Sequence, residues 1–93
     1  MTVSETVRRI LVDDIFVEVP VESMNDDDSL RDVFGLDSLG FVELRVQCQQ
    51  AFDVKITNDD FTPDNFATIR SVRELVERLL AGSAHPAAPA ERA

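Results

Sequence analysis

The chain has 93 residues, and its 18 acidic and 9 basic side chains give it a formal net charge of −9 at pH 7. This length fits one small domain, and the negative charge argues against nucleic-acid binding, because basic side chains supply most of the affinity for phosphates. The sequence contains no apolar run near 18 residues and no recognisable signal peptide. It therefore predicts a cytoplasmic protein that stays off membranes and meets basic patches on its partners.

Cysteine and histidine, the usual ligands of structural zinc sites, are few. The single cysteine, Cys48, excludes an internal disulfide, and with a single histidine, His85, the chain has no set of ligands for a structural zinc site. Two Asp-rich stretches, 25–28 and 58–60, lack the later ligand and the glycine that a calcium loop requires. We expect no metal site and interpret these acids as solvated loops and helix caps.

The first predicted helix covers residues 3–17. Thr2 and Glu5 have the spacing of a capping box, and Pro20 prevents the helix from continuing. Apolar residues recur at helical intervals at Val3, Val7, Ile10, Leu11 and Ile15. A long connection, residues 18–37, follows. Its length requires apolar side chains that hold it on the bundle, and the candidates are Val19, Val21, Met24, Leu30, Val33, Phe34 and Leu36.

The second predicted helix, residues 38–52, begins at a distinctive place. Asp37 is a good N-cap, because its carboxylate can accept the free N–H groups of the first turn. Ser38 then occupies the first helical position, with its hydroxyl exposed on two sides. Gly35 permits a sharp turn just before the cap. An ordinary helix cap would look the same from composition alone.

This helix has two apolar stripes, whereas a helix in a small bundle needs one. The first stripe contains Phe41, Leu44, Cys48, Ala51 and Phe52, and the second, next to Ser38, contains Leu39, Val42 and Val46. Two interpretations are open. Either neighbouring elements bury both stripes, or the second stripe is partly exposed and forms a docking face.

The last third of the chain predicts shorter elements and one more long helix. Asn58 can cap a short turn through Phe61, and Thr62-Pro63 predicts a short helix ending near Phe66. Thr68 caps the last helix, which Gly82 ends. Residues 83–93 are rich in Ala and Pro and predict a disordered tail after a domain of residues 1–82.

The motif Gly35-Leu36-Asp37-Ser38-Leu39, followed by Val42-Glu43-Leu44 and Phe52, resembles the attachment site of the acyl carrier proteins. The resemblance extends over residues 7–80. It implies an all-α four-helix bundle with three longer helices, a short third helix and a long first loop. It also implies a phosphoprotein in which a phosphopantetheinyl transferase, using coenzyme A and magnesium, attaches 4′-phosphopantetheine to Ser38 beside Asp37. The arm then carries an acyl group as a thioester.

The resemblance also suggests which residues serve the carrier. In the family this side of the helix docks onto partner enzymes, which implies a docking face of Leu39, Val42, Glu43 and Val46. Cargo sequestration in the bundle is a further hypothesis, with candidate pocket residues Phe16, Phe34, Phe41, Leu44, Phe61, Phe66 and Ile69. Ser38 has no plausible catalytic base, and Cys48 lies on the predicted core face. We therefore expect a monomeric carrier and no enzyme.

Departures from the fatty-acid type of carrier concern the docking helix. Gly40 replaces a usual acid, Arg45 lies in mid-helix, and the glutamines that follow are neutral. We infer dedicated partners, such as an acyltransferase, ligase or ketosynthase of polyketide or related secondary-metabolite biosynthesis. One alternative is a peptidyl or aminoacyl carrier, although these usually show Gly-Gly-His/Asp-Ser at the motif. The other is an acidic helical interaction module that is never modified.

Overall fold

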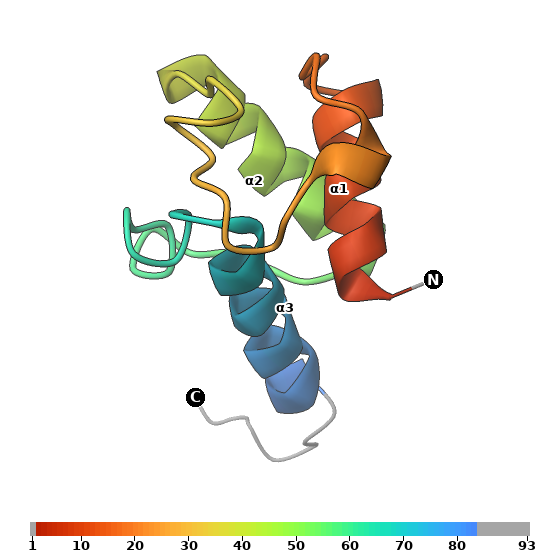
Figure 1. Ribbon diagram of the computed structural model, residues 1–93. Helices are drawn as coiled ribbons and strands as arrows, with labels where there is room; N and C mark the ends of the chain where they lie inside the picture. Colours follow the sequence, from red (N-terminus) through yellow and green to blue (C-terminus); the bar gives the residue numbers. More distant parts are fainter. Residues whose placement is uncertain (1, 84–93) are drawn as a thin grey trace.

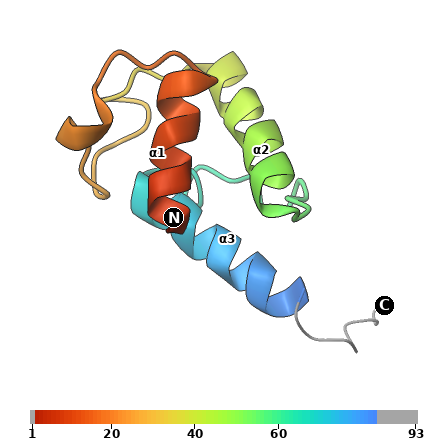
Figure 2. The same ribbon diagram turned by 90° about the vertical axis from the view of Figure 1, so that its right-hand side faces the viewer.

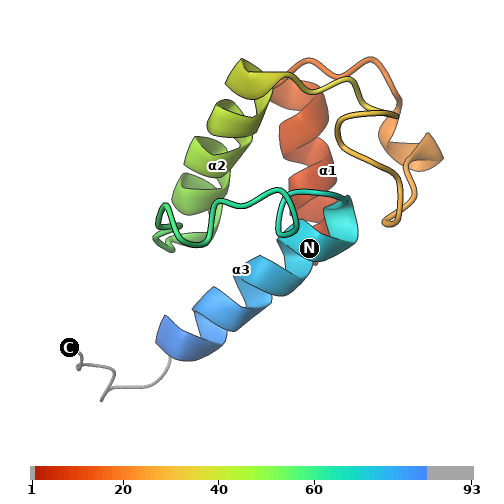
Figure 3. The same ribbon diagram turned by 90° about the vertical axis from the view of Figure 1, so that its left-hand side faces the viewer.

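The computed structural model describes residues 2–83, which form three α-helices: α1 (Val3–Asp13), α2 (Ser38–Phe52) and α3 (Ile69–Ser83). A single-turn 3-10 helix, η1 (Val21–Ser23), interrupts the connection between α1 and α2. Helix α1 packs against both α2 and α3 (Figure 1). Two side views show α3 crossing beneath the other helices, with its C-terminal half projecting from the bundle (Figures 2 and 3). Within residues 2–83, no helix has the length and apolar character that crossing a membrane requires.

All three helices begin where the sequence predicts, each at a side-chain cap. Thr2 and Glu5 form a complete capping box at α1. The Gly40 N–H donates to Asp37 Oδ1 at 2.8 Å at the start of α2. At α3, the Ser71 N–H donates to Thr68 Oγ1 at 3.0 Å. Local capping chemistry therefore sets the N-terminal boundary of every helix.

The end of α1 differs from the prediction. The helix stops at Asp13 instead of residue 17, because the backbone of Phe16 is left-handed, with φ of 65°. Two wide hydrogen bonds close the turn, from the Ile15 N–H to Ile10 O at 3.1 Å and from the Val17 N–H to Leu11 O at 2.9 Å. The side chain of Phe16 is 79% exposed. Its predicted place in the bundle interior is therefore wrong.

The predicted short third helix is a single turn. The Phe66 N–H donates to Thr62 O at 3.1 Å, and the Asn65 N–H donates to Thr62 Oγ1 at 3.2 Å. Thr62 thus caps as expected, but residues 63–66 remain a turn. The all-α class is confirmed for residues 2–83, which contain no strand, while the count of four helices is not.

Arg45 holds the segment between α2 and α3. Its Nε and Nη2 donate to Ile56 O at 3.0 and 2.6 Å, and its Nη1 donates to Asn58 Oδ1 at 3.1 Å. The guanidinium also lies 5.0 Å from the ring centroid of Phe61, within the range of a cation–π contact. The sequence suggested that Arg45 changes the charge of the docking helix, but its side chain instead holds the segment between α2 and α3 in place. The prediction that Asn58 caps the following turn is wrong: its Oδ1 accepts from Arg45 instead. Thr57 is the cap, because its Oγ1 accepts from the Asp60 N–H at 3.3 Å.

The core lies where the three helices and the long connection meet. The connection contributes four buried apolar side chains: Met24, Leu30, Phe34 and Leu36. Backbone contacts fix it to the start of α3, where the Leu30 N–H donates to Ala67 O at 2.9 Å and Ser29 forms a bridge with Thr68. Val21 and Val33, expected to hold the connection as well, are exposed. The fully buried side chains of the helices are Val7, Leu11, Leu44, Cys48, Ile69, Val72, Leu75 and Val76.

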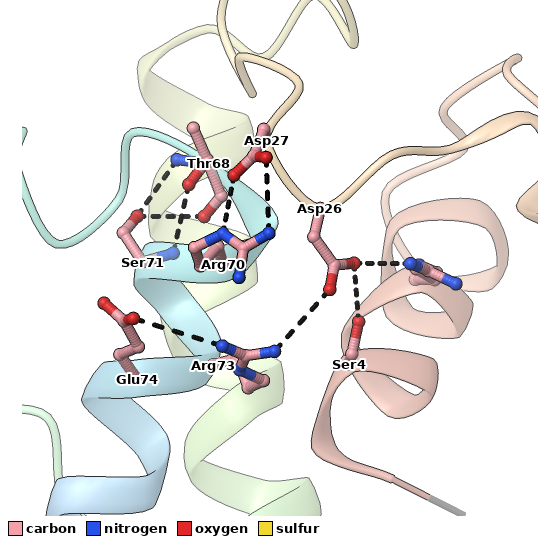
Figure 4. A network of polar contacts seen from close by, with 9 residues as sticks. Ser4, Asp26, Asp27, Thr68, Arg70, Ser71, Arg73 and Glu74 are labelled. Carbon is pink, nitrogen blue, oxygen red and sulfur yellow. Dashed lines mark hydrogen bonds and ion pairs between the residues drawn. The ribbon is translucent and has the colours of Figure 1, made fainter.

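Asp26 joins the connection to two helices (Figure 4). Its Oδ1 accepts from Ser4 Oγ at 2.8 Å and from Arg8 Nη2, both on α1, and its Oδ2 lies 3.7 Å from Arg73 Nη1 on α3. Burial raises the pKa of Asp26, but the hydrogen bonds from Ser4 and Arg8 and the charges of the two arginines outweigh it and lower the pKa overall. The buried Nε atoms of Arg8 and Arg73 have no hydrogen-bond partner within the described residues. The Arg8 guanidinium therefore pairs with Asp26, while that of Arg73 also lies 4.0 Å from Glu74 Oε2 and 3.8 Å from Glu77 Oε1.

The neighbouring Asp27 makes a more exposed pair. Its carboxylate accepts from Arg70 Nε at 2.6 Å and from Nη2 at 3.2 Å, and the Arg70 N–H donates to Asp26 O at 2.8 Å. The hydrogen bonds and charge of Arg70 lower the pKa of Asp27. The Asp-rich stretch at 25–28 thus serves as an attachment of the connection to α3.

The end of α3 also differs from the prediction. The helix passes through Gly82 to Ser83, so Gly82 is not its stop. Apart from Ser83, the predicted tail of residues 83–93 lies outside the described residues.

Candidate functional site: the start of helix α2

Ser38 is the first residue of α2 and is exposed to solvent. Asp37 precedes it in an extended conformation and supplies the cap, so the Ser38 hydroxyl is not used as a cap. Gly35 has φ of 73°, a left-handed value that a side chain would strain. The hydroxyl therefore stands at the positive end of a 15-residue helix, where a phosphate group is favoured. The site fits a phosphate-linked group on Ser38.

Gly40 leaves little room for a side chain beside this site. A Cβ at this position would lie 3.2 Å from Leu36 Cγ and 3.4 Å from Asp37 Oδ1. The first turn of α2 carries no acidic residue. Gly40, which replaces the usual acid, is thus the position at which Leu36 approaches the helix closely.

The two apolar stripes of α2 have different environments. On one side Leu44 and Cys48 are fully buried, while on the other Leu39 is 79%, Val42 48% and Val46 36% exposed. Glu43, also on this helix, accepts from Gln47 Nε2 at 2.7 Å. The interpretation in which neighbours bury both stripes does not hold. An exposed apolar strip runs along α2 from the residue after Ser38.

A cavity of about 430 Å³ lies beside Ser38, which contributes to its lining. Phe41, Phe61 and Phe66 line it too, and the rings of Phe61 and Phe66 meet edge to face with centroids 4.9 Å apart. The volume is in the range of small-ligand sites. The other predicted pocket residues Phe34, Leu44 and Ile69 are buried in the core and are not among its lining residues.

Sequence reasoning missed Arg31 as part of this cavity. Its guanidinium lies 5.7 Å from the ring centroid of Phe41, on the wall that also includes Ser38. No spacing rule connects Arg31 to α2, because the connection brings it there through its packing. Phe16 was missed as a surface residue for a similar reason, since left-handed backbone is usually marked by Gly or Asn.

Cys48 is fully buried, and burial raises the pKa of its thiol to about 12. A thiol with such a pKa is almost entirely protonated at neutral pH and is a poor nucleophile. This agrees with the prediction of an inert core cysteine.

Comparison with known proteins places this arrangement in a family. The phosphopantetheine attachment site family matches residues 5–79. The D-alanyl carrier protein of Streptococcus pyogenes serotype M1 is 38% identical over 79 residues, which cover 85% of this chain and 96% of the relative.

Two solved structures are also similar. A holo acyl carrier protein from Nitrosomonas europaea superposes with a TM-score of 0.76 and 26% identity, over 87% of this chain and 99% of that one. An engineered Bradyrhizobium japonicum glycine:[carrier protein] ligase, complexed with a carrier protein from Agrobacterium tumefaciens and ATP, contains a chain that matches with a TM-score of 0.73 and 26% identity. That match covers 82% of this chain and 97% of the other.

The family is defined by a phosphopantetheine attachment site. Its members are carriers of a covalently attached 4′-phosphopantetheine and are not enzymes. The chain belongs to the phosphopantetheine-attachment family of carrier proteins.

Proposed function

We propose that Ser38 bears the 4′-phosphopantetheine arm and that the chain presents a carboxylic-acid-derived cargo to successive enzymes. The observation that carries this assignment is the position of Ser38, exposed at the first residue of α2 with the capping role taken by Asp37. When bound, the arm supplies a thiol that holds the cargo as a thioester. Asp37 fixes the helix start, and the helix dipole favours the phosphodiester.

The loading step uses Ser38 as a nucleophile. Its Oγ forms a bond to the phosphorus that bears pantetheine in coenzyme A, while the pyrophosphate linkage breaks and adenosine 3′,5′-bisphosphate leaves. The proton of the hydroxyl passes to a base of the transferase, because the adjacent carboxylate, that of Asp37, already accepts the capping hydrogen bond from the Gly40 N–H. Magnesium, bound in the transferase reaction, offsets the charge on the phosphates.

Intact mass after incubation with coenzyme A, magnesium and a broad-specificity phosphopantetheinyl transferase tests the site. We expect wild type to gain one phosphopantetheine and Ser38→Ala to gain none. Ser23→Ala, which changes an exposed serine of η1, serves as the control and should load normally. Thermal unfolding of Ser38→Ala should match wild type, because the cap is Asp37. Loading of Ser38→Ala, or a folded wild type that stays unloaded, would reject the assignment.

Leu39, Val42, Glu43 and Val46 are proposed as the face that meets the transferase and the cargo-handling enzymes. Three of them are exposed apolar side chains in line with Ser38, and an exposed apolar patch with a polar rim is typical of an interface. Candidate partners are a ligase, an acyltransferase or a ketosynthase.

Two cargo classes remain to be separated. The Leu36-Asp37-Ser38 motif favours an acyl group of a polyketide or related secondary-metabolite pathway. Similarity to a D-alanyl carrier protein and to a carrier complexed with a glycine ligase supports an aminoacyl group. We favour the aminoacyl class, because the 38% identity extends over most of both chains.

The chain that bears the phosphopantetheine arm is used to distinguish the two cargo classes. One sample is incubated with D-alanine or glycine, each with ATP and a ligase that activates that amino acid. A parallel sample is incubated with malonyl-coenzyme A and a malonyl acyltransferase. Intact mass reports which group is attached. Attachment of malonyl with no attachment of either amino acid would overturn the aminoacyl choice and support the polyketide class.

A further inference from the structure

A groove of about 810 Å³ lies on the surface next to the start of α2. Three separate parts of the chain form it: residues 14–19 after α1, residues 32–37 of the connection, and the first turns of α2. Leu39, the residue directly after Ser38, is part of its lining. Whatever covers the groove therefore comes close to Ser38.

The groove gathers exposed apolar side chains. Of the seven large hydrophobic residues that are exposed in the described part of the chain, four line it: Phe16, Val33, Leu39 and Val42. Phe16 and Leu39 are both 79% exposed. Gathering four of these seven residues in one groove is characteristic of a protein-binding surface.

Phe16 is the least expected of these residues. Its backbone has φ of 65°, a conformation that is unfavourable for a large side chain and that Gly or Asn adopts more readily. Its ring gains little packing in return, because most of it faces solvent. Neither the backbone nor the core accounts for a phenylalanine here, whereas an aromatic anchor for a partner would.

The charges around the groove are all of one sign. Five acidic residues line it, and within the described residues its lining includes no Lys, Arg or His; the acids are Asp14, Glu18, Asp32, Asp37 and Glu43. A complementary partner surface has an apolar recess surrounded by basic side chains. An acidic second copy of this chain does not meet that requirement.

The phosphopantetheinyl transferase is the partner expected to supply the basic part of such a surface. An enzyme that delivers coenzyme A to Ser38 must bind several phosphate groups next to that residue, and basic side chains are the usual means. Given the proposed attachment at Ser38, we infer that this groove docks the transferase and that Phe16 is its apolar anchor. The docking face on α2 thereby continues across the connection to the end of α1.

Loading kinetics test the inference. The full chain, as Phe16→Ala and Phe16→Asn, is compared with wild type and with Leu80→Ala, an exposed apolar residue on α3. Intact mass gives kcat and KM for a broad-specificity transferase with coenzyme A, and calorimetry gives the Kd of the unloaded chain for that transferase. Asn keeps the left-handed backbone, so the second variant separates loss of the ring from loss of the turn.

We expect both Phe16 variants to lower kcat/KM about tenfold, mainly through KM, and to weaken Kd by a similar factor. Leu80→Ala should stay within about twofold of wild type. Raising the salt concentration from about 50 to about 500 mM should lower kcat/KM for wild type.

Wild-type kinetics for both Phe16 variants would overturn the inference while leaving the proposed function intact. Size-exclusion chromatography of the same samples adds a second check. A wild-type dimer that becomes monomeric in the Phe16 variants, with loading unchanged, would assign the groove to self-association and reject transferase docking. A folded wild type that is never loaded would reject the proposed function itself, and the inference with it.

Discussion

Asp26 and Phe16 both lie between α1 and α2, yet Asp26 contacts the helices whereas Phe16 is exposed to solvent. Asp26 accepts hydrogen bonds from α1 and lies next to an arginine of α3, and its side chain is only 20% exposed. Phe16 has an unfavourable backbone conformation and a side chain that is 79% exposed. The middle of the connection is thus held against α1 and α3, whereas Phe16, near its start, presents apolar surface in the groove that Leu39 also lines.

Two groups of acidic residues in this chain have different surroundings. Acids that face arginines hold the connection to the bundle, as Asp26 and Asp27 do with Arg8, Arg70 and Arg73. Acids around the groove face solvent without a basic neighbour in its lining. Substitutions of Asp26 and Asp27 should therefore change stability. Substitutions of the exposed groove acids Asp14, Glu18 and Asp32, whose side chains supply no helix cap within the described residues, should change recognition.

The largest stability effect should come from Asp26→Asn. This change keeps the side-chain size but removes the charge that faces two half-buried arginines, and we expect unfolding free energy to fall by about 2 kcal/mol. Urea unfolding followed by circular dichroism measures it. Asp27→Asn is the matched control and should lose less, because the Asp27–Arg70 pair is more exposed. Equal losses of unfolding free energy in the two variants would mean that the Asp26 contacts stabilise the fold no more than the exposed Asp27–Arg70 pair does.

The same network should make stability depend on pH. The pKa of Asp26 is held below its ordinary value of 3.8, so the folded chain binds this proton more weakly than the unfolded chain. Its contribution is therefore complete above that ordinary value and is lost as the pH falls through the lowered pKa. Urea unfolding at a series of pH values should show the gap between wild type and Asp26→Asn shrinking in acid. A gap that is independent of pH would contradict the assigned charge contacts.

A smaller effect should distinguish the two left-handed positions that line the groove, Phe16 and Gly35. Gly35→Ala should cost about 1 kcal/mol, because a Cβ strains this backbone even where space is free. Phe16→Asn should raise stability by up to about 1 kcal/mol, since Asn tolerates the conformation better. Thermal unfolding reports both signs. A destabilised Phe16→Asn would show that the ring contributes to the fold.

The smallest stability effect is expected at the exposed stripe of α2. Leu39→Glu and Val42→Glu should change unfolding free energy by no more than about 0.5 kcal/mol while weakening partner docking. Transferase loading kinetics and thermal unfolding on the same samples provide the measurement. If either variant unfolds the protein, that stripe belongs to the core and the two-sided interpretation of α2 is wrong.

Local signals predicted much of the fold. Both boundaries of α2 agree with the prediction, because Asp37 caps its start and Asp53, in left-handed backbone, ends it. The starts of α1 and α3 follow from Thr2 and Thr68 in the same way. Leu39 and Val42 were placed on a separate face by helical periodicity alone, and their exposure confirms that placement.

What the sequence did not predict depends on contacts between distant residues. Ser4 and Arg73 lie far from Asp26 along the chain, so no local pattern reveals their network. The early end of α1 was missed because a phenylalanine occupies a position that usually takes Gly. The turn at 63–66 has a proper cap and proline but does not extend into a helix. Candidate pocket residues were separated into cavity wall and core only by packing.

The buried cysteine has a consequence for the chemical lifetime of the cargo. Thiolates exchange with thioesters, so a reactive cysteine on the carrier would compete with the enzymes that are meant to receive the cargo. Cys48 is the sole cysteine of the chain, and its pKa of about 12 keeps it protonated within the core. The folded domain thus protects the activated bond that it is proposed to carry, and local unfolding of α2 would end that protection.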